Sequence, residues 1–223
     1  MADVFITGGT GYIGRALIPE LLRRGHGVRA LVRPGSEGKL PRGAAAIAGD
    51  ALDGASVRDA LGDAGTLIHL VGVAHPSPAK ARLFRQIDLA SVRASVAAAR
   101  GRGVRHFVYV SVAHPAPAMQ AYVAARMEGE ALIREAGLDA TIVRPWYVLG
   151  PGHWWPVALL PAYWVAERLP PTRSGALRLG LVRLGEMVAA LAMVVENPPV
   201  GIRILEVPEI RAAGRCLPGF RPS

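Results

Sequence analysis

The chain has 223 residues, a length that fits one α/β domain with a sizeable core. Hydrophobic residues make up 51% of it and charged residues 19%, which excludes a disordered or fibrous protein. The formal net charge is +9, yet the arginines are scattered and form no basic run, so we expect no nucleic-acid partner.

The single cysteine, Cys216, excludes an intramolecular disulfide and favours a cytoplasmic protein. Asp3 stands where a signal peptide needs positive charge. The longest apolar stretch, residues 154–166, contains two prolines and is shorter than the ~20 residues that span a bilayer. We therefore expect no transmembrane segment, and leave peripheral membrane contact open.

The chain opens with a strand, a glycine turn, a helix and a second strand. Residues 4–6 predict the first strand, apolar residues from Tyr12 follow helical spacing, and residues 28–32 predict the next strand. Further strands are expected at 45–48, 66–71, 106–110, 140–143 and 202–207, and helices at 56–61, 81–100, 119–136 and 185–196. This alternation predicts an α/β fold with a mainly parallel sheet covered on both faces.

We expect one domain over residues 1–208, with one break in its pattern. Residues 146–173 are rich in Pro and Trp and predict a small inserted lobe on the substrate side of the sheet. Their aromatic side chains suit an apolar or planar ligand, although a core plug with a partner-facing patch explains them equally well. Residues 209–223 show no apolar period and are expected to form a loosely ordered tail.

The glycine turn has the spacing of a dinucleotide-binding loop. Gly8, Gly11 and Gly14 follow the first strand, where the backbone must turn sharply, approach a pyrophosphate and let the helix pack on the sheet. The N-terminus of the next helix presents unpaired N–H groups to an anion. The predicted cofactor-binding segment is Gly8, Gly9, Thr10, Gly11, Tyr12, Ile13 and Gly14. A purely structural glycine turn is the alternative.

Arg33 ends the second strand, at the position where an acidic residue would bind the ribose 2′-hydroxyl of NAD. A guanidinium there suits the 2′-phosphate of NADP, so we expect NADP(H) in preference to NAD(H). Arg29 lies on the same face of the strand and either assists or is solvated.

Other short motifs follow in chain order: Gly49-Asp50, His69-Leu70-Val71-Gly72, Phe107-Val108-Tyr109-Val110-Ser111, Tyr122, Arg144-Pro145 and Gly150-Pro151-Gly152. With the glycine turn, they resemble the short-chain dehydrogenase/reductase superfamily, in its atypical branch of NmrA-like proteins and the NADPH-binding accessory subunit of respiratory complex I. The resemblance implies a Rossmann-like, doubly wound sheet in the order 3-2-1-4-5-6-7.

The resemblance also implies contacts along the cofactor. Asp50 corresponds to the carboxylate that accepts from the adenine amine, with Ala51 beside it. Leu70, Val71 and Gly72 correspond to the strand end that lines the ribose, and Pro145 to the residue beside the nicotinamide. Asp50 could instead be a helix N-cap.

In active members of the family, a Ser, a Tyr and a Lys four residues after the Tyr perform the chemistry. Ser111 and Tyr122 occupy the first two positions, but Arg126 replaces the Lys. A guanidinium on the same helix face favours the phenolate, yet it does not relay protons as Lys does. The structural alternatives are a turn cap for Ser111, packing for Tyr122, and a surface ion pair with Glu130 for Arg126.

These observations lead to two functional hypotheses. The first is an NADP(H)-dependent oxidoreductase that acts on a small apolar carbonyl or a quinone-like substrate, with Tyr122 as acid/base, Ser111 steadying the carbonyl oxygen and Arg126 biasing Tyr122. The second is a non-catalytic NADPH-binding sensor or accessory subunit, which Arg126 favours. The six histidines lack metal-ligand spacing, so no metal is expected, and a protein partner or homo-oligomer is left open.

Overall fold

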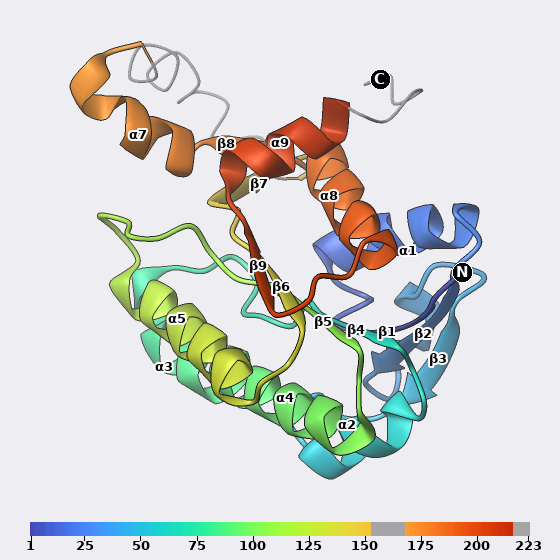
Figure 1. Cartoon of the computed structure of the whole chain (residues 1–223). Coiled ribbons are helices and arrows are strands. Elements are labelled where there is room, and N and C mark those ends of the chain that lie inside the picture. Colours follow the sequence, from blue (N-terminus) through green and yellow to red (C-terminus); the bar gives the residue numbers. More distant parts are fainter. Residues whose placement is uncertain (153–167, 216–223) are drawn as a thin grey trace.

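A parallel sheet of seven strands organises the protein in the computed structural model, which describes residues 1–152 and 168–215 (Figure 1). The order along the sheet is β3-β2-β1-β4-β5-β6-β9. The strands are β1 (Asp3–Thr7), β2 (Gly27–Val32), β3 (Ala45–Ala48), β4 (Thr66–His69), β5 (His106–Val110), β6 (Ala140–Val143) and β9 (Ile202–Leu205). This order confirms the Rossmann-like prediction, with β9 as the seventh strand of the sheet.

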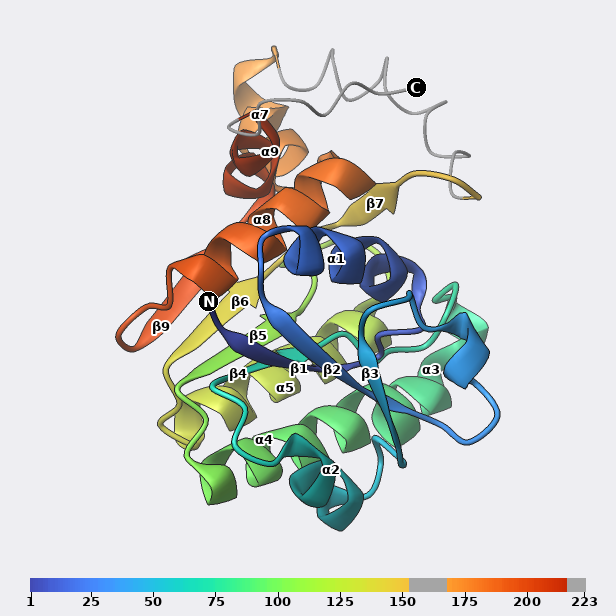
Figure 2. The ribbon, with the colours of Figure 1, turned by 90° about the vertical axis from the view of Figure 1, so that its right-hand side faces the viewer.

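Helices cover both faces of the sheet, because the strands present apolar side chains on both faces. Val4 and Ile6 of β1 point into one core, and Phe5 between them points into the other. Helices α1 (Tyr12–Arg23) and α8 (Leu184–Glu196) cover the first face. Helices α2 (Gly54–Leu61), α4 (Ala90–Arg102) and α5 (Gln120–Glu135) cover the second, as Figure 2 shows.

The strand order reverses between β1 and β4, which are neighbours in the middle of the sheet. Thr7 at the end of β1 is paired with His69 at the end of β4, and the N–H of Leu70 donates to the carbonyl of Thr7 at 2.9 Å. In open α/β sheets, ligands bind outside the carboxyl ends of the strands at such a reversal. The predicted nucleotide-binding segments follow these two strands and lie at the reversal.

The expected helix over residues 81–100 is interrupted. It consists of α3 (Ala81–Leu83), a π-helical segment η3 (Phe84–Leu89) and α4, and it follows the 3-10 turn η2 (Pro78–Lys80). Wider i→i+5 turns of this kind are frequent at functional sites. The 3-10 turn η1 (Glu37–Lys39) lies between β2 and β3.

The expected lobe is described only in part, since residues 153–167 with three of the tryptophans lie outside the described residues. The described part contains a two-stranded parallel sheet of β7 (Tyr147–Leu149) and β8 (Leu181–Arg183), and helix α7 (Pro170–Arg178). No helix in residues 1–152 and 168–215 is long and apolar enough to cross a membrane.

The expectation of a loosely ordered tail from residue 209 is wrong for its first part. Helix α9 (Val207–Arg215) buries Val207, Ile210 and Ala213 in the core that also contains α8. These residues lie three apart, so they form a short apolar stripe that α8 covers. Residues 216–223 lie outside the described residues.

Candidate functional site

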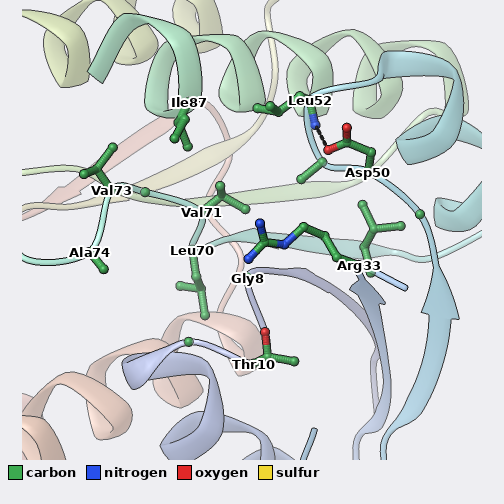
Figure 3. A pocket seen from close by; sticks show the side chains of 15 residues that line it. Gly8, Thr10, Arg33, Asp50, Leu52, Leu70, Val71, Val73, Ala74 and Ile87 are labelled. Carbon is green, nitrogen blue, oxygen red and sulfur yellow. Dashed lines mark hydrogen bonds between the residues drawn. The ribbon is translucent and has the colours of Figure 1, made fainter. Parts of the chain in front are cut away.

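A cavity of about 490 Å³ lies at the carboxyl ends of the strands around the reversal (Figure 3). Nine of the predicted cofactor residues line it: Gly8, Thr10, Gly11, Arg33, Asp50, Ala51, Leu70, Val71 and Gly72. Five do not: Gly9, Tyr12, Ile13, Gly14 and Pro145. The sequence analysis missed six lining residues: Leu31, Gly49, Leu52, Val73, Ala74 and Ile87. The structure thus brings most of the predicted segments together around one cavity.

The glycine turn is held tightly against the end of β4. Gly8 has φ +82°, and a Cβ there would lie 2.8 Å from the carbonyl carbon of Leu70. A Cβ on Gly14 would lie 2.6 Å from the carbonyl oxygens of both Gly8 and Gly9. Gly8 therefore allows the turn at the cavity, whereas Gly14 allows α1 to pack on the turn from behind.

Arg33 follows β2 directly and is exposed. Its guanidinium points into the cavity, toward the end of β4 (Figure 3). It makes no ion pair with any residue in 1–152 or 168–215. Arg29, by contrast, donates to Asp3 at 2.8 Å and to the carbonyl of Leu61 at 3.2 Å, and it does not line the cavity. Only one of the two arginines of β2 and its end is therefore placed to meet a ligand in the described cavity.

Asp50 lies across the cavity from the glycine turn and is not a helix N-cap. The N-cap of α2 is Asp53, whose carboxylate accepts from the N–H groups of Ala55 and Ser56 at 3.1 and 3.2 Å. Asp50 instead accepts from the N–H of Leu52 at 3.0 Å through Oδ1, as Figure 3 shows. Among the described residues, its Oδ2 has no hydrogen-bond donor, so this oxygen can accept from a ligand.

Ser111 is buried, and its hydroxyl donates to Glu130 Oε1 at 2.7 Å rather than to a turn. Glu130 is 1% exposed and also accepts from Arg144 Nε at 2.8 Å and from Arg134 at 3.1 Å. Burial alone would raise the pKa of Glu130, but the hydrogen bonds from Arg144 and Ser111 outweigh it and lower this pKa. Sequence reasoning missed Glu130 as a partner of Ser111, because nothing in the spacing links the two residues.

Arg126 lies beside Tyr122, with its Cζ 5.2 Å from the centroid of the phenol ring. Tyr122 is half-buried, and its ring centroid is 5.1 Å from that of Phe84 on η3. The guanidinium of Arg126 is buried and pairs with Asp88 at 2.7 Å, so the alternative of a surface pair with Glu130 is wrong. Burial alone would lower the pKa of Arg126. The electrostatic interactions of its guanidinium with Tyr122, Tyr109 and Asp88 are larger in sum, so this pKa is raised.

The three predicted catalytic residues therefore lie beside the cavity and not in its lining. Tyr122 and Arg126 are adjacent, whereas the hydroxyl of Ser111 is directed to Glu130. Arg126 connects the group to the cavity, because its Nη2 is 3.4 Å from the carbonyl oxygen of Val71.

Residues 8–150 match the NAD(P)H-binding family. Ceramide reductase of Caulobacter vibrioides is 29% identical over 218 residues, which cover 95% of this chain and 66% of that protein. The 4-hydroxy-2-methyl-3-oxo-4-farnesyl-3,4-dihydroquinoline-1-oxide ketoreductase of Stigmatella aurantiaca is 27% identical over 66% of this chain and 50% of that protein. The chain thus spans less than two thirds of the length of these two relatives.

Solved structures share the fold. The Bordetella bronchiseptica enzyme WbmH, solved in complex with NAD⁺, superimposes with a TM-score of 0.69 at 21% identity, over 92% of this chain and 75% of that one. The family match extends over more than half of the sequence and includes the glycine turn, Arg33 and strand β4 at the reversal. The chain therefore belongs to the NAD(P)H-binding family, resembles reductases in sequence, and shares the fold of a solved short-chain dehydrogenase/reductase structure, in agreement with the resemblance to that superfamily.

Proposed function

We propose that the protein is an NADP(H)-dependent oxidoreductase that acts on a small apolar carbonyl or quinone-like substrate. The observation that carries the proposal is Arg33, a guanidinium without an ion-pair partner in the described residues, directed into a cavity that the glycine turn also lines. A 2′-phosphate has the charge and the acceptor oxygens that such a guanidinium binds best.

In this proposal, the segment Gly8–Gly14 binds the pyrophosphate through backbone N–H groups at the start of α1. The free Oδ2 of Asp50 accepts a hydrogen bond from the adenine amine, with Ala51 beside it. Leu70, Val71 and Gly72 would line a ribose, and Pro145, which lies outside the lining of the described cavity, would lie beside the nicotinamide.

When bound, NADP(H) would supply the hydride for the carbonyl carbon. Tyr122 would donate its phenolic proton to the substrate oxygen, so that hydride and proton together convert the carbonyl to an alcohol. Arg126, next to the ring, favours the resulting phenolate. Ser111 steadies the substrate oxygen, which requires its hydroxyl to turn away from Glu130.

The proposed substrate class rests on two features. The relatives whose names specify a substrate include reductases of ceramide and of a farnesylated quinoline oxide, both with long apolar groups. Next to the described part of the lobe, the side chain of Tyr122 packs in a small apolar cluster with Val112, Ala116 and Trp146. An apolar carbonyl compound suits a proton donor in such surroundings.

The second candidate is an NADPH-binding sensor without turnover. Two observations favour it: Arg126 is held by Asp88, and the hydroxyl of Ser111 is occupied by Glu130. Both candidates bind the same nucleotide, so they differ only in the chemical step.

The first experiment is a fluorescence titration of the protein with NADPH and, separately, with NADH. We expect tighter binding of NADPH, and Arg33→Ala should weaken it about ten- to a hundredfold while leaving NADH unchanged. Arg29→Ala is the matched control, because it removes a guanidinium four residues before Arg33, on β2, that does not line the cavity. Equal losses for both nucleotides in Arg33→Ala would contradict the 2′-phosphate assignment.

The second experiment separates enzyme from sensor. Oxidation of NADPH is followed with a panel of apolar ketones and quinones. Turnover that disappears in Tyr122→Phe, with nucleotide affinity retained, supports the oxidoreductase. No turnover in the wild-type protein across the panel favours the sensor.

A further inference from the structure

Asp88 is a buried carboxylate between the cavity and helix α5. It lies on the π-helical segment η3, is 0% exposed, and follows Ile87, which lines the cavity. Its two oxygens face two different donors. Oδ1 accepts from Arg126 Nη2 at 2.7 Å, and Oδ2 accepts from the backbone N–H of Val73 at 3.0 Å.

Arg126 extends this arrangement to the ends of two strands. Its Nη1 donates to the carbonyl of Val110, the last residue of β5, at 2.9 Å. Its Nη2 lies 3.4 Å from the carbonyl of Val71 in the segment after β4. The segment from Val71 to Val73 is thus fixed at both ends, by Arg126 and by Asp88, and all three of its residues line the cavity.

Gly72, in the middle of this segment, leaves the space that Arg126 occupies. A Cβ at position 72 would collide with Nη2 of Arg126 and would lie 3.2 Å from Oδ1 of Asp88. Arg126 is 5% exposed, and its guanidinium is hydrogen-bonded on two sides, so it cannot move aside easily. The close approach of this segment to the pair is therefore built into the chain.

We infer that Asp88 and Arg126 form a positioning pair that fixes the backbone of residues 71–73 as one wall of the nucleotide cavity. That the wall contacts a nucleotide rests on the proposed function. Arg126, in this inference, acts through the backbone it holds and not as a carrier of protons.

The chemistry of the pair requires these two residue types. An Asn at position 88 has one acceptor oxygen and one donor nitrogen, so in either orientation its NH₂ group faces a donor, Arg126 or Val73. A Lys at position 126 has one nitrogen on a shorter chain, which cannot contact Val110 and Asp88 as the two Nη atoms do. Each substitution therefore breaks at least one of the hydrogen bonds that join Asp88, Arg126, Val110 and Val73, and so weakens the hold of the pair on residues 71–73.

The test is amide hydrogen exchange of Val73 in the nucleotide-free protein, in wild type, Asp88→Asn and Arg126→Lys. We expect the Val73 amide to exchange about tenfold faster or more in Asp88→Asn. Leu191→Ala is the control, because Leu191 is fully buried on α8 and touches neither the pair nor the cavity, so it lowers overall stability alone. Exchange at Val73 no faster than in Leu191→Ala would overturn the inference.

Nucleotide affinity is the second measurement. Both pair variants should weaken NADPH and NADH by a similar factor, about tenfold, since the wall is distinct from the Arg33 end of the cavity. If Asp88→Asn does not fold, Arg126→Lys keeps a cation beside Asp88 and tests the same contacts. Unchanged affinity for both nucleotides in a variant with faster Val73 exchange would refute the role of the wall. Absence of binding in the wild-type protein would refute the proposed function and leave the exchange test of the pair intact.

Discussion

His69 makes the stability of the protein depend on pH. It ends β4, is 0% exposed, and its ring is surrounded by hydroxyl groups. Nδ1 lies 2.9 Å from Thr7 Oγ1 and 3.0 Å from Ser95 Oγ, and Nε2 lies 3.3 Å from Ser91 Oγ. Burial, and to a smaller extent the charge of Arg126, lowers the pKa of His69 from 6.5 to about 3. The folded protein therefore holds a neutral imidazole where the unfolded chain takes up a proton.

The size of the effect follows from this difference in pKa. One pKa unit corresponds to about 1.4 kcal/mol, so the full shift corresponds to about 5 kcal/mol. In the window between pH 6.5 and 3, the unfolded chain binds more protons, so the free energy of unfolding falls as the pH falls. Between pH 7 and pH 5, His69 lowers the free energy of unfolding by about 2 kcal/mol. The total free energy of unfolding of a folded domain is typically about 5–15 kcal/mol, so this loss is a sizeable part of it.

Denaturant unfolding of the wild type and of His69→Gln at pH 7 and pH 5 measures this loss. The variant keeps a hydrogen-bonding side chain but does not titrate. We expect the wild type to lose about 2 kcal/mol more than the variant between the two pH values, whatever the stability of the variant at pH 7. Equal losses in the two proteins would show that His69 is not held neutral and would refute the reasoning.

Three further predictions concern other parts of the molecule. Gly14→Ala places a Cβ 2.6 Å from two carbonyl oxygens and should cost about 1–3 kcal/mol of stability and weaken nucleotide binding; unchanged melting and affinity would contradict this. Glu130→Gln leaves Arg144 without its main counter-charge and should cost about 3–5 kcal/mol by denaturant unfolding, whereas a loss below 1 kcal/mol (on the order of a surface pair) would refute the role of burial. Asp53→Ala removes the N-cap of α2 and should cost about 1 kcal/mol by the same assay, with nucleotide affinity unchanged.

The sheet could be predicted from the sequence because its signals are local. Residues 4–6 form a short apolar run before a glycine turn, and they are buried on both faces in β1. The helix α9 was missed because it is stabilised by the packing of its three buried residues against α8. A contact between two helices cannot be recognised from a sequence window of nine residues. The π-helical segment η3 was missed because one wider turn scarcely changes the apolar period of the helix around it.

In the candidate site too, features set by local sequence could be predicted, whereas contacts between distant elements could not. The position of the glycine turn and of Arg33 at one cavity could be predicted, because both follow parallel strands and so lie at the same edge of the sheet. The partner of Arg126 was not, since spacing on one helix suggested Glu130 four residues later, whereas the structure provides Asp88 from η3. The i, i+4 rule describes a helix surface in solvent, but this face of α5 is buried, and there a carboxylate from another element competes successfully.

The pairing of buried charges indicates where an anionic ligand would bind. Arg126 and Arg144, both buried near the carboxyl ends of β5 and β6, are neutralised by the buried carboxylates of Asp88 and Glu130. Such pairs keep their geometry but offer little net charge to a ligand. Arg33, in contrast, faces the cavity without a counter-charge in the described residues, close to the N-terminus of α1. Among the described lining residues, the groups that suit phosphates thus lie at the glycine turn and at the end of β2, where the phosphates of NADP(H) are proposed to bind, and Val71, Val73 and Ala74 contribute apolar side chains.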